Sequence, residues 1–182
     1  MADYHVVLLA EEELSTSDAE QVTGLHRELV DEGERVVYHL LVPEDDAAAR
    51  VEAAMGSLSG GEMLASPVTA LPPEELEKAQ EQAHGRATAS LRASLDRLQA
   101  AGGTAEGRVI AEHPVDALIA EVGACDGREA IVLTRSHVVA EFFHVDWTSQ
   151  ARRKLGVPVL HLLEHETFEE QGPGAGEGNT GL

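Results

Sequence analysis

The chain has 182 residues, a hydrophobic content of 43% and a formal net charge of −20 at pH 7. This length and composition are typical of a single globular domain and argue against wholesale disorder. The acidic balance argues against nucleic acid and anionic membranes as partners, because both bind through basic surfaces. No apolar stretch fits a signal peptide or a membrane span, so a cytoplasmic protein is expected. The single cysteine, Cys125, allows no intramolecular disulfide.

The first forty residues have the pattern of a strand, a helix and a second strand. The apolar run Tyr4–Ala10 predicts a buried parallel strand. Ser17 and Glu20 then predict a capping box at the start of a helix that Gly33 ends. The spacing predicts that this helix buries one apolar face, made of Val22, Leu25, Leu29 and Val30. The run Arg35–Val42 predicts the second strand.

Residues 43–73 form an irregular insertion that contains glycine and proline breakers. Such a segment is either a surface loop without fixed structure or a functional element, and the first is the more common case. The longest predicted helix follows, from Glu74 to Ala101, after Pro72-Pro73 and before Gly102-Gly103. One face of this helix is apolar along its length, and we expect that face to pack against a sheet: Leu76, Ala79, Ala83, Ala87, Leu91, Leu95 and Leu98.

The second half of the chain predicts three more strands: Thr104–Ile110, Ala130–Leu133 and Val157–Leu163. A helix that begins at His113-Pro114 separates the first two, and a helix from Asp146 to Gly156 precedes the last. This alternation predicts an α/β fold, a doubly wound five-stranded parallel sheet in three α/β/α layers. Ligands of such sheets bind beyond the carboxyl ends of the strands, so the polar stretch that starts at Thr134 is the candidate site.

The domain is expected to span residues 1–165. Residues 166–182 are rich in glycine and acidic side chains and contain no lysine or arginine. This composition predicts a disordered tail.

Three local patterns resemble the universal stress protein family: the apolar first strand, the segment Ala111–Ile119 that leads to Ala130–Leu133, and the final Gly156–Leu163. The resemblance implies the strand order 3-2-1-4-5 of adenine-nucleotide alpha-hydrolase-like folds. It also implies a homodimer formed through the last strand, residues 157–163. Many family members bind ATP through a loop of the form G-x2-G-x9-G-[S/T], beside an aspartate at the end of the first strand.

The residues that correspond to this pocket depart from the family pattern. The candidate positions are Ala10, Thr134, Arg135, Ser136, Asp146, Thr148 and Ser149. None of them is glycine, and Ala10, Glu11 and Glu12 stand where the aspartate would be. Asp146 is the predicted N-cap of the following helix, so its carboxylate occupies the place of a phosphate. We therefore expect no ATP binding of the family type and no cofactor, although Arg135 could pair either with a phosphate or with Asp146.

Three functions remain open. The first is a non-enzymatic stress-response or regulatory protein. The second is a nucleotide-binding protein that uses Arg135, Ser136, Thr148 and Ser149 in place of glycines. The third is a metal-dependent sensor or enzyme, because His137, Glu141 and His144 have the spacing of one helical face. An ordinary polar face explains that spacing equally well. The sequence contains no triad pattern, Gly-x-Ser-x-Gly or Walker loop, so we predict no catalytic residue.

Overall fold

The computed structural model describes residues 3–44, 73–134 and 155–163. Within these ranges five strands form one parallel sheet in the order β3-β2-β1-β4-β5. The predicted fold class and the strand order implied by the resemblance are confirmed. The elements along the chain are β1 Tyr4–Ala10, α1 Thr16–Leu25, α2 Arg27–Asp31, β2 Val36–Pro43, α4 Pro73–Ala100, β3 Thr104–Ile110, α5 Pro114–Cys125, β4 Glu129–Thr134 and β5 Val159–Leu163.

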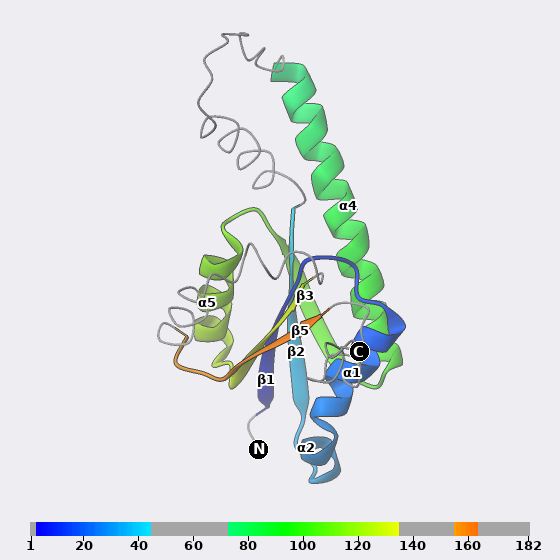
Figure 1. The fold of residues 1–182 in the computed structure, drawn as a ribbon, viewed down its shortest axis with the longest axis vertical. Helices are drawn as coiled ribbons and strands as arrows, with labels where there is room; N and C mark the ends of the chain where they lie inside the picture. Colours follow the sequence, from blue (N-terminus) through cyan, green and yellow to red (C-terminus); the bar gives the residue numbers. More distant parts are fainter. Residues whose placement is uncertain (1–2, 45–72, 135–154, 164–182) are drawn as a thin grey trace, which may run out of the picture.

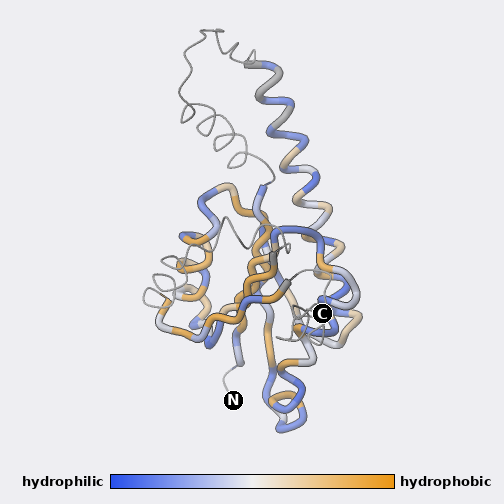
Figure 2. Tube along the Cα trace, in the orientation of Figure 1, coloured by the Kyte–Doolittle hydropathy of each residue, from blue (hydrophilic) through white to orange (hydrophobic). Residues whose placement is uncertain are grey.

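The helices cover the two faces of the sheet, as Figure 1 shows: α1, α2 and α4 lie on one side and α5 lies on the other. Alternate residues of the central strand β1 supply the two cores. Val6 and Leu8 belong to the cluster under α1 and α4. Val7 and Leu9 belong to the cluster under α5. The central strands β1, β2 and β4 therefore bury both of their faces, which explains why they are continuous apolar runs in the sequence (Figure 2).

The predicted single helix after β1 is wrong in two respects. Its N-cap is Ser15, not Ser17: the Ser15 side chain accepts from the Asp18 N–H, and Asp18 Oδ2 accepts from the Ser15 N–H at 2.8 Å. The helix also breaks at His26 into α1 and α2. Because of this break, Leu25 and Val30 do not share the buried face and are 43% and 54% exposed.

The predicted long helix is confirmed as α4, which begins at Pro73. Its 28 residues correspond to about 42 Å of helix, so its first half extends beyond the sheet (Figure 1). Ala87 and Leu98 lie in the core, and Leu91 and Leu95 pack against it. After the last turn, Gly102 adopts a positive φ of 88° and Gly103 N–H donates to the carbonyl of Leu98.

Three predicted segments fall mostly or wholly outside the described residues. One is the predicted helix from Asp146 to Gly156, of which residues 146–154 lie outside. Of the insertion at 43–73, residues 45–72 lie outside; Pro43 belongs to β2 and Pro73 to α4. The predicted tail, residues 166–182, lies outside entirely. In the helices that are described, no stretch is long and apolar enough to cross a membrane.

Candidate functional site

The candidate site lies where β1 and β4 end side by side in the middle of the sheet. The chain leaves β1 toward α1 on one face and reaches β4 from α5 on the other, so the strand order reverses between these two strands. Ala10 is opposite Leu133 in the register, and the Glu11 N–H donates to the Leu133 carbonyl at 3.2 Å. This is the carboxyl-end crevice in which doubly wound sheets bind their ligands.

The structure brings together two of the seven predicted site residues. Ala10 is the last residue of β1 and is fully buried, and Thr134 ends the neighbouring strand β4. The other five predicted positions lie outside the described residues: Arg135, Ser136, Asp146, Thr148 and Ser149. The candidate metal ligands His137, Glu141 and His144 lie outside them as well. Among the residues that are described, no three His, Cys, Asp or Glu side chains are grouped to hold a metal ion.

The loop that follows β1 is held by α4. Leu14 is fully buried, and its N–H donates to the Ser94 hydroxyl at 2.9 Å. Its carbonyl accepts from Arg97 Nη1 at 2.5 Å, and the same guanidinium pairs with Glu13 at 2.6 Å. The carboxylates that begin this loop, Glu11 and Glu12, are therefore carried on an anchored segment of backbone directly beside the crevice.

Acidic side chains also follow the ends of β2 and β3. Glu44 comes directly after β2 and contacts His84 of α4 at 2.6 Å. Glu112 follows β3 and accepts a hydrogen bond from Arg108 at 2.8 Å. This hydrogen bond is the main cause that lowers the pKa of Glu112 and raises that of Arg108. The carboxyl edge of the sheet is consequently rich in carboxylates, and the basic side chains named here already have acidic partners.

The amino half of the sheet contains a buried polar cluster that the sequence analysis missed. His26, at the break between α1 and α2, contacts the Tyr38 hydroxyl at 3.0 Å and the Val22 carbonyl at 3.1 Å through Nδ1. Its Nε2 contacts the Glu129 carboxylate at the start of β4. Burial is the main cause that raises the pKa of Tyr38, and the nearby Glu129 charge adds to it.

A second histidine contact lies on the face covered by α5. His5 Nδ1 is 2.9 Å from His39 Nε2, and His39 Nδ1 is 3.1 Å from Glu106. The sequence carried a signal for this contact and for the cluster around His26: in both, a histidine or tyrosine stands inside or next to an otherwise apolar run. A buried polar group needs a partner, so each such residue predicts an unseen contact.

No protein-family model and no curated protein matches the chain. A universal stress protein from Lactobacillus plantarum superposes with a TM-score of 0.50 at 12% identity, over 89% of this chain and 99% of that one. A family protein from Arabidopsis thaliana with AMP bound gives 0.48 at 12%, over 93% and 97%. One from Archaeoglobus fulgidus gives 0.46 at 13%, over 87% and 93%. The chain therefore has the fold of the universal stress proteins.

Proposed function

We propose that this chain is a non-enzymatic regulatory protein of the universal stress protein type that does not bind ATP in the manner typical of the family. One observation carries the proposal: Glu11 and Glu12 directly follow Ala10 at the crevice between β1 and β4, and the Glu11 N–H donates to the Leu133 carbonyl of β4, where the resemblance implies an aspartate. The predicted N-cap Asp146 and the absence of glycine at the loop positions add to the argument from the sequence.

The electrostatic cost of a triphosphate at this edge is considerable. Two unit charges about 4 Å apart interact by about 1 kcal/mol in water and by about 4 kcal/mol near a protein surface. A family site offsets phosphate charge with backbone N–H groups at a glycine loop and a helix N-terminus. Here Arg97 and His84 stand on the same side of the sheet, but each already contacts a glutamate. Repulsion at this edge is thus not offset by these two side chains.

Calorimetric titration with ATP and Mg²⁺ tests the proposal directly. We expect no micromolar binding, and micromolar binding would overturn the proposal. Nucleotide that co-purifies with the protein, visible in its ultraviolet spectrum, would instead support the alternative site built on Arg135, Ser136, Thr148 and Ser149.

A pair of double variants separates the two reasons for weak binding. If the carboxylates repel phosphate, Glu11→Gln with Glu12→Gln raises the affinity for ATP by about tenfold, equivalent to about 1.4 kcal/mol. The matched control is Glu28→Gln with Glu32→Gln, two exposed glutamates at the other end of the sheet, which should leave the affinity unchanged. If both double variants bind ATP with the same affinity, the weak ATP binding is due to the loop after β4, which lacks the family's glycines, and not to the glutamates at the end of β1.

We also propose that the protein forms a homodimer through its last strand. Within the part of the chain that the structure describes, β5 is an edge strand that pairs only with β4, and Leu160 on it is 37% exposed. An exposed strand edge with an apolar side chain favours pairing with a second copy. Sedimentation analysis should show that Leu160→Lys dissociates the dimer, whereas Leu25→Lys, at an equally exposed leucine of α1, does not. A wild-type protein that is monomeric at micromolar concentration would refute this proposal.

A further inference from the structure

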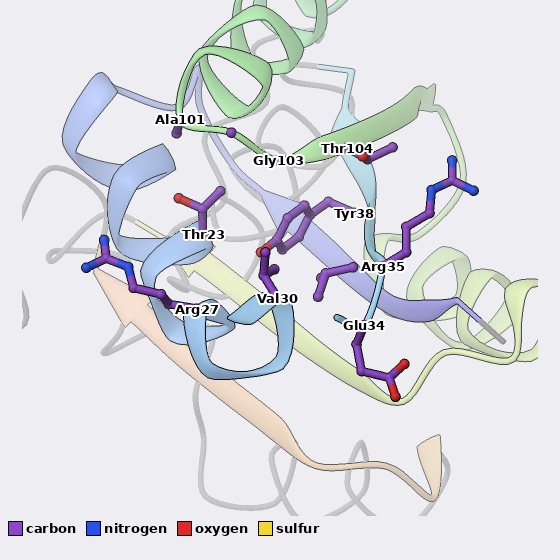
Figure 3. A pocket seen from close by; sticks show the side chains of 11 residues that line it. Thr23, Arg27, Val30, Glu34, Arg35, Tyr38, Ala101, Gly103 and Thr104 are labelled. Carbon is purple, nitrogen blue, oxygen red and sulfur yellow. The ribbon is translucent and has the colours of Figure 1, made fainter. Parts of the chain in front are cut away.

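A second cavity lies at the opposite, amino-terminal edge of the sheet. It has a volume of about 470 Å³, within the range of small-molecule sites. Its walls come from three places: the segment from Thr23 to Val30 on α1 and α2, the start of β2, and the turn Gly102-Gly103 that joins α4 to β3 (Figure 3). The cavity is therefore separated from the crevice at the carboxyl ends of β1 and β4 by the length of the strands.

The middle of this cavity is apolar. Figure 3 shows the ring of Tyr38 and the side chain of Val30 next to each other at its centre. The Tyr38 ring is almost fully buried by protein, whereas Val30 is 54% exposed although it is a large apolar side chain. An exposed valine that borders a hollow gives an apolar ligand a surface to cover.

The Tyr38 hydroxyl belongs to the buried polar cluster around His26. His26 Nδ1 is 3.1 Å from the Val22 carbonyl, and its Nε2 contacts the Glu129 carboxylate. The Tyr38 oxygen lies 3.0 Å from His26 Nδ1, so the hydroxyl already has a hydrogen-bond partner inside the protein.

The rim of the cavity carries basic side chains. Arg27 and Arg35 line it on either side of Tyr38 in Figure 3, and Glu34 is the one acidic residue among the lining side chains. Arg35 is already paired with Asp3 at 2.9 Å. Arg27 forms no ion pair with any carboxylate that the structure describes. In a chain with a net charge of −20, this free guanidinium beside an apolar hollow favours an anionic ligand group.

We propose that this cavity binds a small amphipathic carboxylate. The apolar body of the ligand, an aromatic ring or a branched alkyl group, covers Val30 and the Tyr38 ring. The carboxylate binds Arg27 at the rim. The site is independent of the crevice at the carboxyl edge, so it neither requires nor excludes a nucleotide there.

Phenylacetate serves as the probe, in a titration followed by amide chemical shifts of the full chain. We expect saturable shifts at Thr23, Gly102, Gly103 and Thr104, with millimolar affinity. Phenylacetamide, which has the same ring and no charge, should bind about fivefold more weakly, as expected for the loss of one exposed charge contact. Shifts spread over the whole protein, or none at all, would overturn the proposal.

Matched variants locate the binding. Val30→Trp fills the cavity and should weaken phenylacetate binding at least about tenfold, equivalent to about 1.4 kcal/mol. Leu25→Trp places the same side chain at an exposed position that does not line the cavity and should have no effect. Arg27→Gln should remove the preference for phenylacetate over phenylacetamide, whereas Arg92→Gln on α4 should retain it. If Val30→Trp fails to fold, Val30→Ser tests the same wall. The proposed site is refuted if Val30→Trp and Leu25→Trp change phenylacetate binding equally, or if Arg27→Gln and Arg92→Gln change the preference for phenylacetate equally.

Discussion

The close contact between β2, β3 and α4 at Gly107 yields a sharp prediction. Gly107 pairs with Leu40 in the sheet. A Cβ atom at this position would overlap the Leu40 carbonyl oxygen and would lie 3.0 Å from both Leu40 Cβ and Leu91 Cδ1. The carbonyl is backbone and cannot rotate away, so Gly107→Ala must displace one strand from the other. Overpacking of this kind costs about 1 to 3 kcal/mol, and we expect about 3 kcal/mol here.

Gly85 provides the matched control because it lies on the exposed part of α4, where a methyl group in place of its hydrogen would have no other atom within 4 Å. Replacing a helical glycine by alanine stabilises the folded state by about 1 kcal/mol. In a chain of this size 1 kcal/mol corresponds to about 2 to 4 °C. The melting temperature should therefore fall by about 6 to 12 °C in Gly107→Ala and rise by about 2 to 4 °C in Gly85→Ala.

Differential scanning calorimetry of both variants at neutral pH measures these shifts. If Gly107→Ala melts within about 1 °C of the wild type, the packing of β3 between β2 and α4 is not as the structure describes. The assigned position of β3 at the edge of the sheet would then lose its support. A loss of stability in Gly85→Ala would point instead to a contact of the exposed half of α4.

Three further predictions concern single side chains. Ser94→Ala leaves the buried Leu14 N–H without its acceptor and should cost about 1 to 3 kcal/mol in urea unfolding; an unchanged midpoint contradicts this. Burial raises the pKa of the Cys125 thiol, so iodoacetamide should modify it much more slowly in the folded than in the urea-unfolded chain, and equal rates contradict this. Burial lowers the pKa of His161 below 6.5, so the unfolded chain binds its proton first. Stability should fall as pH drops below about 6.5, and less steeply in His161→Gln; parallel pH profiles contradict this.

The central strands β1, β2 and β4 could be predicted from the sequence because they are buried on both faces. Residues such as Val6 to Ala10 are apolar whichever side they point to, so the run is visible without knowledge of the partners. The break at His26 could not be predicted in this way. Leu25 and Val30 fit the period of one continuous helix, and the interaction that accompanies the break joins His26 to Glu129, 103 residues further along the chain. A periodicity analysis reads only the about 11 to 18 neighbouring residues of a candidate helix, so it cannot detect a contact with a residue so far along the chain.

The side-by-side position of the two strand ends could be predicted from the sequence, and the contacts around them could not. The end of an apolar strand marks the carboxyl edge, so Ala10 and Thr134 were placed on neighbouring strands correctly. The anchoring of the β1 loop by Ser94 and Arg97 was not foreseen, because both lie on the far end of a helix that was assigned only an apolar face. Polar residues on such a helix show their role only when the loop that they hold is known.

The two ends of the sheet differ in the side chains that border their hollows, and this difference links the two proposals. Carboxylates such as Glu11 and Glu44 follow the strands at one end, whereas Arg27 borders a hollow at the other. Anionic ligands should therefore prefer the amino-terminal edge, contrary to the general rule for doubly wound sheets. Titration of one sample with ATP and then with phenylacetate tests each end separately. Chemical-shift changes at Glu11 on adding ATP would refute the acidic-edge argument and leave the proposed cavity site untouched. A Gly103 amide that does not shift on adding phenylacetate would refute the cavity site and leave the acidic-edge argument untouched.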